Sequence, residues 1–219
     1  MNKIVEIILN RLINEPVFKG FKIRKSDECL IQKTTDGFKQ IAFDDHFQDI
    51  DLNNHQLALQ IRPIFKRRFD ILSKWFEKYS FKDLKTQRNN GQIFDNISNE
   101  EFLFYNSGEC FDEQYNKLRN KVIEKAHVFF HDYATLEQLY QKEVFTILTG
   151  EKKMQSVGAD WIFEYLKITW IVDRANYYKL KSLILKQIEF MMFGRRSKEP
   201  NISKYYDRLD EIFADIEQS

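Results

Sequence analysis

Glycine, proline and cysteine are scarce in this chain, whose 219 residues include 7 glycines, 3 prolines and 2 cysteines. Gly37, Gly91 and Gly108 stand isolated, which excludes a glycine-rich loop of the kind that binds phosphates. Cys29 and Cys110 lie far apart and in no Cys-x-x-Cys spacing. This spacing fits a reduced intracellular protein better than a secreted disulfide framework, and we expect both cysteines to be small buried hydrophobes.

An excess of either charge is also absent, because 34 lysines and arginines balance 33 aspartates and glutamates for a net charge of +1. Proteins that bind nucleic acid over a broad face concentrate basic residues, so the balance makes nucleic acid an unfavoured partner and leaves open only a local basic patch. No apolar run is long enough to span a membrane. The N-terminal apolar run contains Glu6 and lacks a signal-peptide cleavage site. We therefore expect a cytoplasmic protein with no membrane partner and no cofactor.

Aromatic residues are plentiful, with 20 phenylalanines and 10 tyrosines. They predict a bulky core, and we expect Trp75, Trp161 and Trp170 to anchor it. The spacing of apolar residues indicates which segments are helices and which are strands. The expected elements are a helix over residues 2–14, strands near 21–25, 29–34, 38–43 and 57–62, a helix over 66–79, short strands near 92–97 and 102–105, and helices over 111–131, 136–149, 159–174, 176–193 and 202–216.

Four local signals mark the boundaries of these elements. Asp36-Gly37 predicts a tight hairpin turn, and Pro63 predicts that the fourth strand lies at a sheet edge or ends there. Thr135 with Gln138 three residues later has the form of a helix capping box, and Gly150 is a helix stop signal.

The order of elements predicts an α+β fold, with an N-terminal helix and an antiparallel strand meander followed by a C-terminal array of helices. The change from strands to helices divides the chain into a sheet portion, residues 1–108, and a helical portion, residues 109–219. The two portions are either separate or parts of one continuous domain. Neither oligomeric state nor partner identity follows from the sequence.

The first strand, which begins at Gly20-Phe21-Lys22, and the helix join at residues 129–139 resemble a bacterial domain family of unknown function. The resemblance covers roughly residues 1–140, and the long helical tail departs from the family pattern. Some domains of this general shape act beside toxin systems as immunity proteins. The resemblance therefore implies a protein-binding, immunity-like role and carries no functional residues over to this chain.

Two basic clusters are the candidate partner-binding residues. Arg67 and Arg68 follow the fourth strand, and Arg195 and Arg196 begin a basic loop near the C-terminus. If the fold unites them, the patch would suit an acidic protein surface or single-stranded nucleic acid. The favoured hypothesis is a non-enzymatic protein-binding module that uses this patch, the open face of the sheet or the concave side of the C-terminal helices.

The main alternative is a metal-dependent or acid–base enzyme, for which the sequence offers two centres. Asp44 and His46 follow a strand, a position where carboxylate and imidazole groups support acid–base or metal chemistry. His127 and His131 lie four residues apart on a helix and share a face, so both can reach one metal ion. Asp132 and Glu124 are close enough to join the histidine pair, but no distant ligand is marked, and Asp44 and His46 lack a partner at a recognisable catalytic spacing. Each pair is also typical of an ordinary solvated surface.

Overall fold

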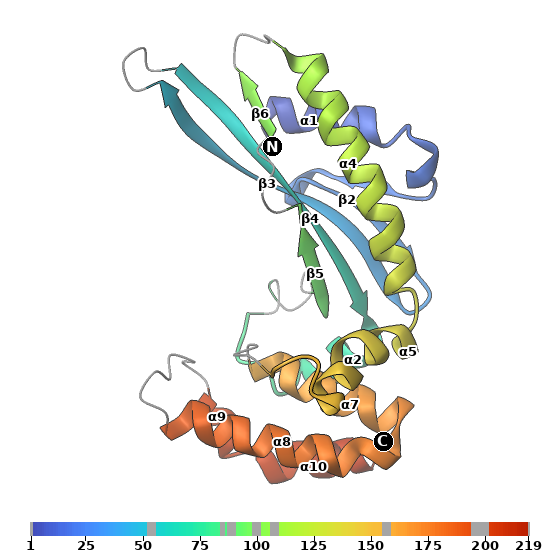
Figure 1. Ribbon diagram of the computed structural model, residues 1–219, viewed down its shortest axis with the longest axis vertical. Coiled ribbons are helices and arrows are strands. Elements are labelled where there is room, and N and C mark those ends of the chain that lie inside the picture. Colours follow the sequence, from blue (N-terminus) through green and yellow to red (C-terminus); the bar gives the residue numbers. More distant parts are fainter. Residues whose placement is uncertain are drawn as a thin grey trace. The chain divides into compact units, whose positions relative to one another are not determined.

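The computed structural model of the chain describes residues 2–51, 56–83, 86, 91–97, 102–105, 110–154, 159–193 and 202–218. The elements confirm the α+β prediction, because a helix and antiparallel strands precede an array of helices (Figure 1). The chain divides into two compact units. Unit 1 is Met1–Arg68 with Ile93–Asp132, and unit 2 is Phe69–Gln92 with Tyr133–Ser219.

Unit 1 is built from one antiparallel sheet and two longer helices. Its elements are α1 (Lys3–Leu12), η1 (Pro16–Phe18), β1 (Lys22–Arg24), η2 (Lys25–Asp27), β2 (Cys29–Thr34), β3 (Gly37–Asp51), β4 (Gln56–Phe69), β5 (Ile93–Asn96), β6 (Phe102–Tyr105) and α4 (Phe111–Asp132). The strand order is β1-β2-β3-β4-β5, and β6 also pairs with β4.

Two strands are much longer than the sequence indicates, since β3 and β4 run well beyond the expected residues 38–43 and 57–62. The prediction that Pro63 ends a strand or places it at an edge is wrong. β4 pairs with β6 from Ala58 to Ile61 and with β5 from Ile64 to Arg67, so Pro63 lies between the two partners. A residue without a backbone N–H is tolerated there, where one ladder stops and the next begins.

One face of the sheet is covered by α1 and α4, which lie on the same side of it (Figure 1). The ring of Phe65, in β4, lies 6.0 Å from that of Phe129 in α4, measured between centroids. The two helices are joined by Arg11, whose guanidinium lies 5.0 Å from the ring centroid of Phe111. The side chains buried on this covered face include Leu30, Ile41, Phe43, Leu59, Ile61, Phe65, Phe102 and Phe104.

Unit 2 is helical. Its elements are α2 (Asp70–Phe76), α5 (Leu136–Leu139), η3 (Tyr140–Phe145), α6 (Thr146–Thr149), α7 (Ala159–Val172), α8 (Arg174–Phe193), α9 (Ile202–Tyr206) and α10 (Leu209–Glu217). The capping box is confirmed, because the Thr135 hydroxyl accepts from the backbone N–H of Gln138 while the Gln138 side chain accepts from that of Thr135. Gly150 ends the segment in a left-handed conformation, with φ of 83°.

Three expectations for unit 2 need correction. The helix expected from residue 66 begins at Asp70, because β4 extends to Phe69 and pairs with β5. The last helix is two helices, since Arg208 has a non-helical backbone between α9 and α10. The three tryptophans are half-buried, whereas Phe163 is fully buried and stacks on Phe76 with ring centroids 5.6 Å apart. Because α7 is apolar on most sides, its sequence does not show which side is central.

The division into units differs from the expected boundary between residues 108 and 109. Helix α4 follows that boundary but belongs to the sheet unit, and α2 precedes it but belongs to the helical unit. Each helix is grouped with the apolar side chains it covers, as the contacts of Phe129 with Phe65 and of Phe76 with Phe163 illustrate. Secondary-structure class therefore does not locate the boundary. No helix in the described part of the chain has the length and apolarity that crossing a membrane requires.

Candidate functional site

Arg67, an expected partner-binding residue, is buried inside unit 1. Its side chain is 2% exposed, and its guanidinium forms an ion pair of 2.6 Å with Asp36 in the β2–β3 turn. The same guanidinium donates to the carbonyls of Arg68 at 2.6 Å and Phe38 at 3.3 Å. Burial alone would raise the pKa of Asp36, but hydrogen bonds from Arg67 and Thr34 outweigh it and leave the pKa lowered. Arg67 therefore links the hairpin to β4, and its predicted contact with a partner stays a prediction that its burial does not favour.

Arg68 is also buried, at 3% exposure, and its guanidinium lies 5.9 Å from the ring centroid of Phe38. Burial therefore does not favour the predicted contact of Arg68 with a partner either, and that contact stays a prediction. The other two predicted partner residues, Arg195 and Arg196, lie outside the described residues. The expected union of the two basic clusters consequently stays a prediction.

The carboxylates around Asp44 are divided between the two faces of β3. Asp44 and His46 are exposed and lie two residues apart on one face, whereas Asp45 is half-buried on the other. Burial raises the pKa of Asp45, and the neighbouring carboxylates of Glu28 and Asp44 raise it further. Glu28 also accepts the backbone N–H of Asn2 at 2.7 Å, so this cluster holds the start of α1 against the sheet.

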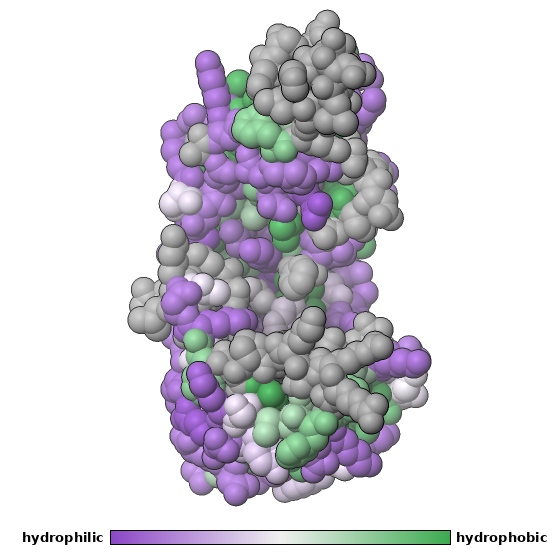
Figure 2. Space-filling model, turned by 90° about the vertical axis from the view of Figure 1, so that its left-hand side faces the viewer, coloured by the Kyte–Doolittle hydropathy of each residue, from purple (hydrophilic) through white to green (hydrophobic). Residues whose placement is uncertain are grey.

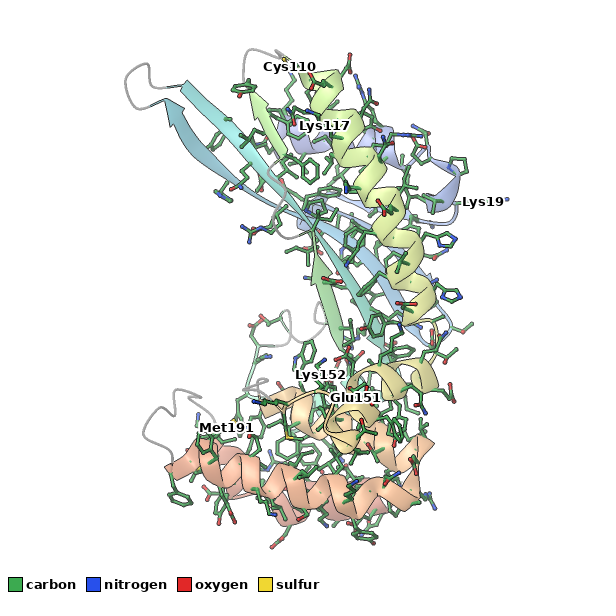
Figure 3. The ribbon with its side chains drawn as sticks, viewed as in Figure 1. Lys19, Cys110, Lys117, Glu151, Lys152 and Met191 are labelled. Atoms are coloured by element: carbon green, nitrogen blue, oxygen red, sulfur yellow. The ribbon has the colours of Figure 1, made fainter. Side chains whose placement is uncertain are left out.

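The histidine pair lies on the outer surface of α4. His127 and His131 are both exposed, and the Nδ1 atom of His131 lies 3.5 Å from Asp132 Oδ1. A search of the described residues finds no group of three or more histidine, cysteine, aspartate or glutamate side chains that could hold a metal ion. Both cysteines are free, but only Cys29 is buried as expected; Cys110 is exposed at the beginning of α4 (Figure 3).

Cationic side chains gather on the face of the sheet that α1 and α4 do not cover. Directly paired residues share a face, so the pairing of Lys22 with Ile31 places Lys22 on the same face as Lys33, two residues further along β2. The residue opposite Lys33 is Phe38. The contact of Arg68 with the Phe38 ring places the even-numbered residues of β4 on this face too.

We call this surface the basic face, and define it by Lys22, Lys33, Arg62 and Lys66. The first three side chains are exposed and Lys66 is half-buried. No ion pair joins any of the four to a carboxylate within the described ranges. Among the strand residues on this face whose side chains are described, Asp44 is the acidic one. Figure 2 shows the molecule from the side away from α4, and the described surface over the sheet is mainly hydrophilic there.

Part of the basic face was visible in the sequence. Arg62 and Lys66 lie shortly before the Arg67–Arg68 cluster in the sequence, whereas Lys22 and Lys33 stand apart from it. The two-residue alternation of β1 and β2 puts each on the polar side of its strand. What the sequence does not contain is the strand order that brings the cations of β1, β2 and β4 into one sheet.

A second polar cluster, also missed, lies in unit 2. Glu143, in the π-helical segment η3, is 8% exposed and accepts from the hydroxyl of Tyr133 at 2.7 Å and from that of Tyr165 at 3.4 Å. The ammonium of Lys152 also pairs with it (Figure 3). Burial raises the pKa of Tyr165, and the negative charge of Glu143 raises it further. Burying a carboxylate is costly without such partners, so this cluster fixes the local packing of η3.

Helices α2, α7 and α10 share a further charged cluster. The indole N–H of Trp75 donates to Asp215 at 2.5 Å, and Lys78 pairs with the same carboxylate at 2.8 Å. Lys167 is 4% exposed, and its ammonium lies 5.3 Å from the ring centroid of Trp75. Burial lowers the pKa of Lys167. Within the cluster Lys167 is buried, whereas the side chains of Lys78 and Asp215 are 54% and 31% exposed.

Comparison of the chain with protein-family models, with curated protein sequences and with solved structures gives no match. Function is therefore inferred from the geometry of each of the two units.

Proposed function

We propose that this chain is a cytoplasmic protein-binding module whose basic face contacts an acidic surface of another protein. The observation that carries the proposal is the positive charge of that face. Among its described strand residues, the cations Lys22, Lys33, Arg62 and Lys66 outnumber the carboxylate of Asp44. Complementary charge across an interface speeds association and rejects wrong partners. The immunity-like resemblance points in the same direction and stays a prediction.

An acidic protein suits this face better than single-stranded nucleic acid does. Proteins that bind single strands stack the bases on accessible aromatic rings between their cations. On the basic face, Phe38 is buried and the guanidinium of Arg68 lies over its ring. The cations therefore lack an aromatic platform at that position, and the near-zero net charge provides no broad attraction for phosphates.

The test compares two double charge reversals in a pull-down from a bacterial lysate. The test variant is Lys33→Glu with Arg62→Glu, and the matched control is Lys19→Glu with Lys117→Glu, which changes net charge equally on the helical side of unit 1 (Figure 3). Like-charge contacts are strongly unfavourable at an interface, so we expect the test variant to lose at least about tenfold in partner affinity and the control to keep it.

Each arm of the pull-down is repeated after nuclease treatment. A protein retained by the wild type and the control, lost by the test variant and insensitive to nuclease would support the proposal. Equal retention by all three proteins would exclude the basic face as the contact surface. Loss of the retained material after nuclease treatment would favour nucleic acid instead, and titration with single-stranded DNA at two salt concentrations would then measure that binding.

A further inference from the structure

The long hairpin of β3 and β4 leaves one strand edge unpaired in the described part of the chain. β2 pairs with β3 as far as Cys29 opposite Ala42, and the N–H of Phe43 then donates to the carbonyl of Glu28 at 3.2 Å. β3 continues to Asp51, with β4 as its other neighbour. Figure 1 shows the two strands running together beyond the end of β2. We call the outer edge of β3 from Asp44 to Asp51 the arm edge.

The backbone of the arm edge is oriented to receive another strand. In an antiparallel sheet, alternate residues direct their N–H and C=O groups to the same side. Phe43 directs its N–H toward β2, so Asp45 and Phe47 direct theirs toward the same, now unoccupied, side. Unpaired strand edges of this kind accept extended peptide segments, whose main chain supplies the hydrogen bonds and whose alternate side chains supply specificity.

The side chains of the arm edge select the chemistry of that segment. Its described side chains, those of residues 44–47, include two aspartates and neither lysine nor arginine. Asp44 is exposed, and the half-buried Asp45 lies close to the carboxylate of Glu28. Phe47, on the same face as Asp45, is 57% exposed. Opposite charges on adjacent strands are stabilising and like charges destabilising, so the edge favours lysine or arginine opposite its aspartates and an apolar residue opposite Phe47.

The same rule argues against a second copy of the chain pairing arm to arm, because such pairing would bring two acidic edges together. We infer that the arm edge binds an extended, lysine- or arginine-bearing segment of another protein by strand addition. Asp44 borders the basic face, but the arm edge is defined by the backbone groups of β3 and takes a partner of the opposite charge, so the inference does not depend on the proposed function.

The first experiment uses three fluorescent peptides with the full chain: one with two adjacent lysines among valines, one with glutamate in place of lysine, and one with the lysine sequence N-methylated at alternate residues. Strand addition requires both the charge and the backbone N–H groups. We expect the lysine peptide to bind and the glutamate peptide not to bind. Methylation should weaken binding about tenfold or more, because it removes the hydrogen bonds along one edge of the peptide.

The second experiment places the binding on the arm edge. Phe47→Pro removes the N–H that points away from β4 at the arm edge, and it keeps the N–H groups that pair β3 with β4. Phe47→Ala is the matched control, because it keeps the N–H of residue 47. We expect the proline variant to lose about tenfold in affinity for the lysine peptide and the alanine variant clearly less.

Three results would overturn the inference: no binding of the lysine peptide, equal binding of its methylated form, or unchanged binding by Phe47→Pro. Association of the chain with itself in place of peptide binding would also overturn it. If the proline variant fails to fold, the methylated peptide still decides the question, because it leaves the protein unaltered.

Discussion

Replacing Arg67 by alanine should destabilise unit 1 strongly, because this side chain joins the β2–β3 turn to β4. The substitution removes the 2.6 Å ion pair with Asp36 and leaves the Phe38 carbonyl without its donor. Breaking a buried pair costs about 3–5 kcal/mol, and a half-exposed partner such as Asp36 recovers part of that through water. We therefore expect a loss of roughly 3 kcal/mol in the free energy of unfolding.

Urea unfolding followed by far-ultraviolet circular dichroism measures this loss, with Arg62→Ala as the control. Arg62 is exposed on the same strand, so its removal should change stability by less than about 0.5 kcal/mol. A loss below about 1 kcal/mol for Arg67→Ala, or equal losses for the two variants, would refute the structural role. If Arg67→Ala left stability unchanged but abolished partner binding, Arg67 would be a binding residue instead.

The contribution of this pair should also depend on pH in a defined direction. The pKa of folded Asp36 lies below its ordinary value of 3.8, where the unfolded chain titrates. A lowered folded pKa means that the stabilisation is fully present above the unfolded pKa and is lost as the pH falls through the folded value. The difference between the wild type and Arg67→Ala should therefore shrink below about pH 4.

Two further predictions concern unit 2. Tryptophan fluorescence reports the stability of this unit, because Trp75, Trp161 and Trp170 all lie in it. Glu143→Gln keeps the shape of the side chain but removes the charge that pairs with Lys152, so the free energy of unfolding should fall by about 1–2 kcal/mol. An unchanged urea midpoint would contradict the role of the Glu143 cluster in stability. Gly150→Ala should lower the free energy of unfolding by about 1 kcal/mol, because the residue has φ of 83°, which an L side chain rarely adopts. The added Cβ has no neighbour within 4 Å, so the cost is conformational and not steric. An unchanged stability would mean that the turn relaxes.

The parts of the fold that the sequence predicted are those decided by neighbouring residues. The period-two pattern located β2 at Cys29–Thr34 and β6 at Phe102–Tyr105, and Thr135 with Gln138 located the start of α5. In each case the signal and the structure it specifies lie within a few residues, so no distant contact has to be known.

The roles of the arginines could not be predicted in this way. Arg67 and Arg68 are adjacent charged residues, and such a pair is typical of a solvated face. Arg67 is buried because Asp36, 31 positions earlier, pairs with it across the sheet. The basic face has the same origin: Lys22 and Lys33 are ordinary polar-side residues until strand pairing sets them beside β3 and β4.

The two proposed surfaces of unit 1 carry opposite charge, which makes their relation testable. If one partner uses both, it must present an acidic surface to the basic face and a basic strand to the arm edge. Mutations at independent sites of one interface add in free energy, so combining Lys33→Glu and Arg62→Glu with Phe47→Pro would then multiply the losses in affinity for that partner. If each surface has its own partner, the lysine peptide should bind the charge-reversal variant as tightly as the wild type. A partner that is lost from one variant and retained by the other would show that unit 1 joins two proteins.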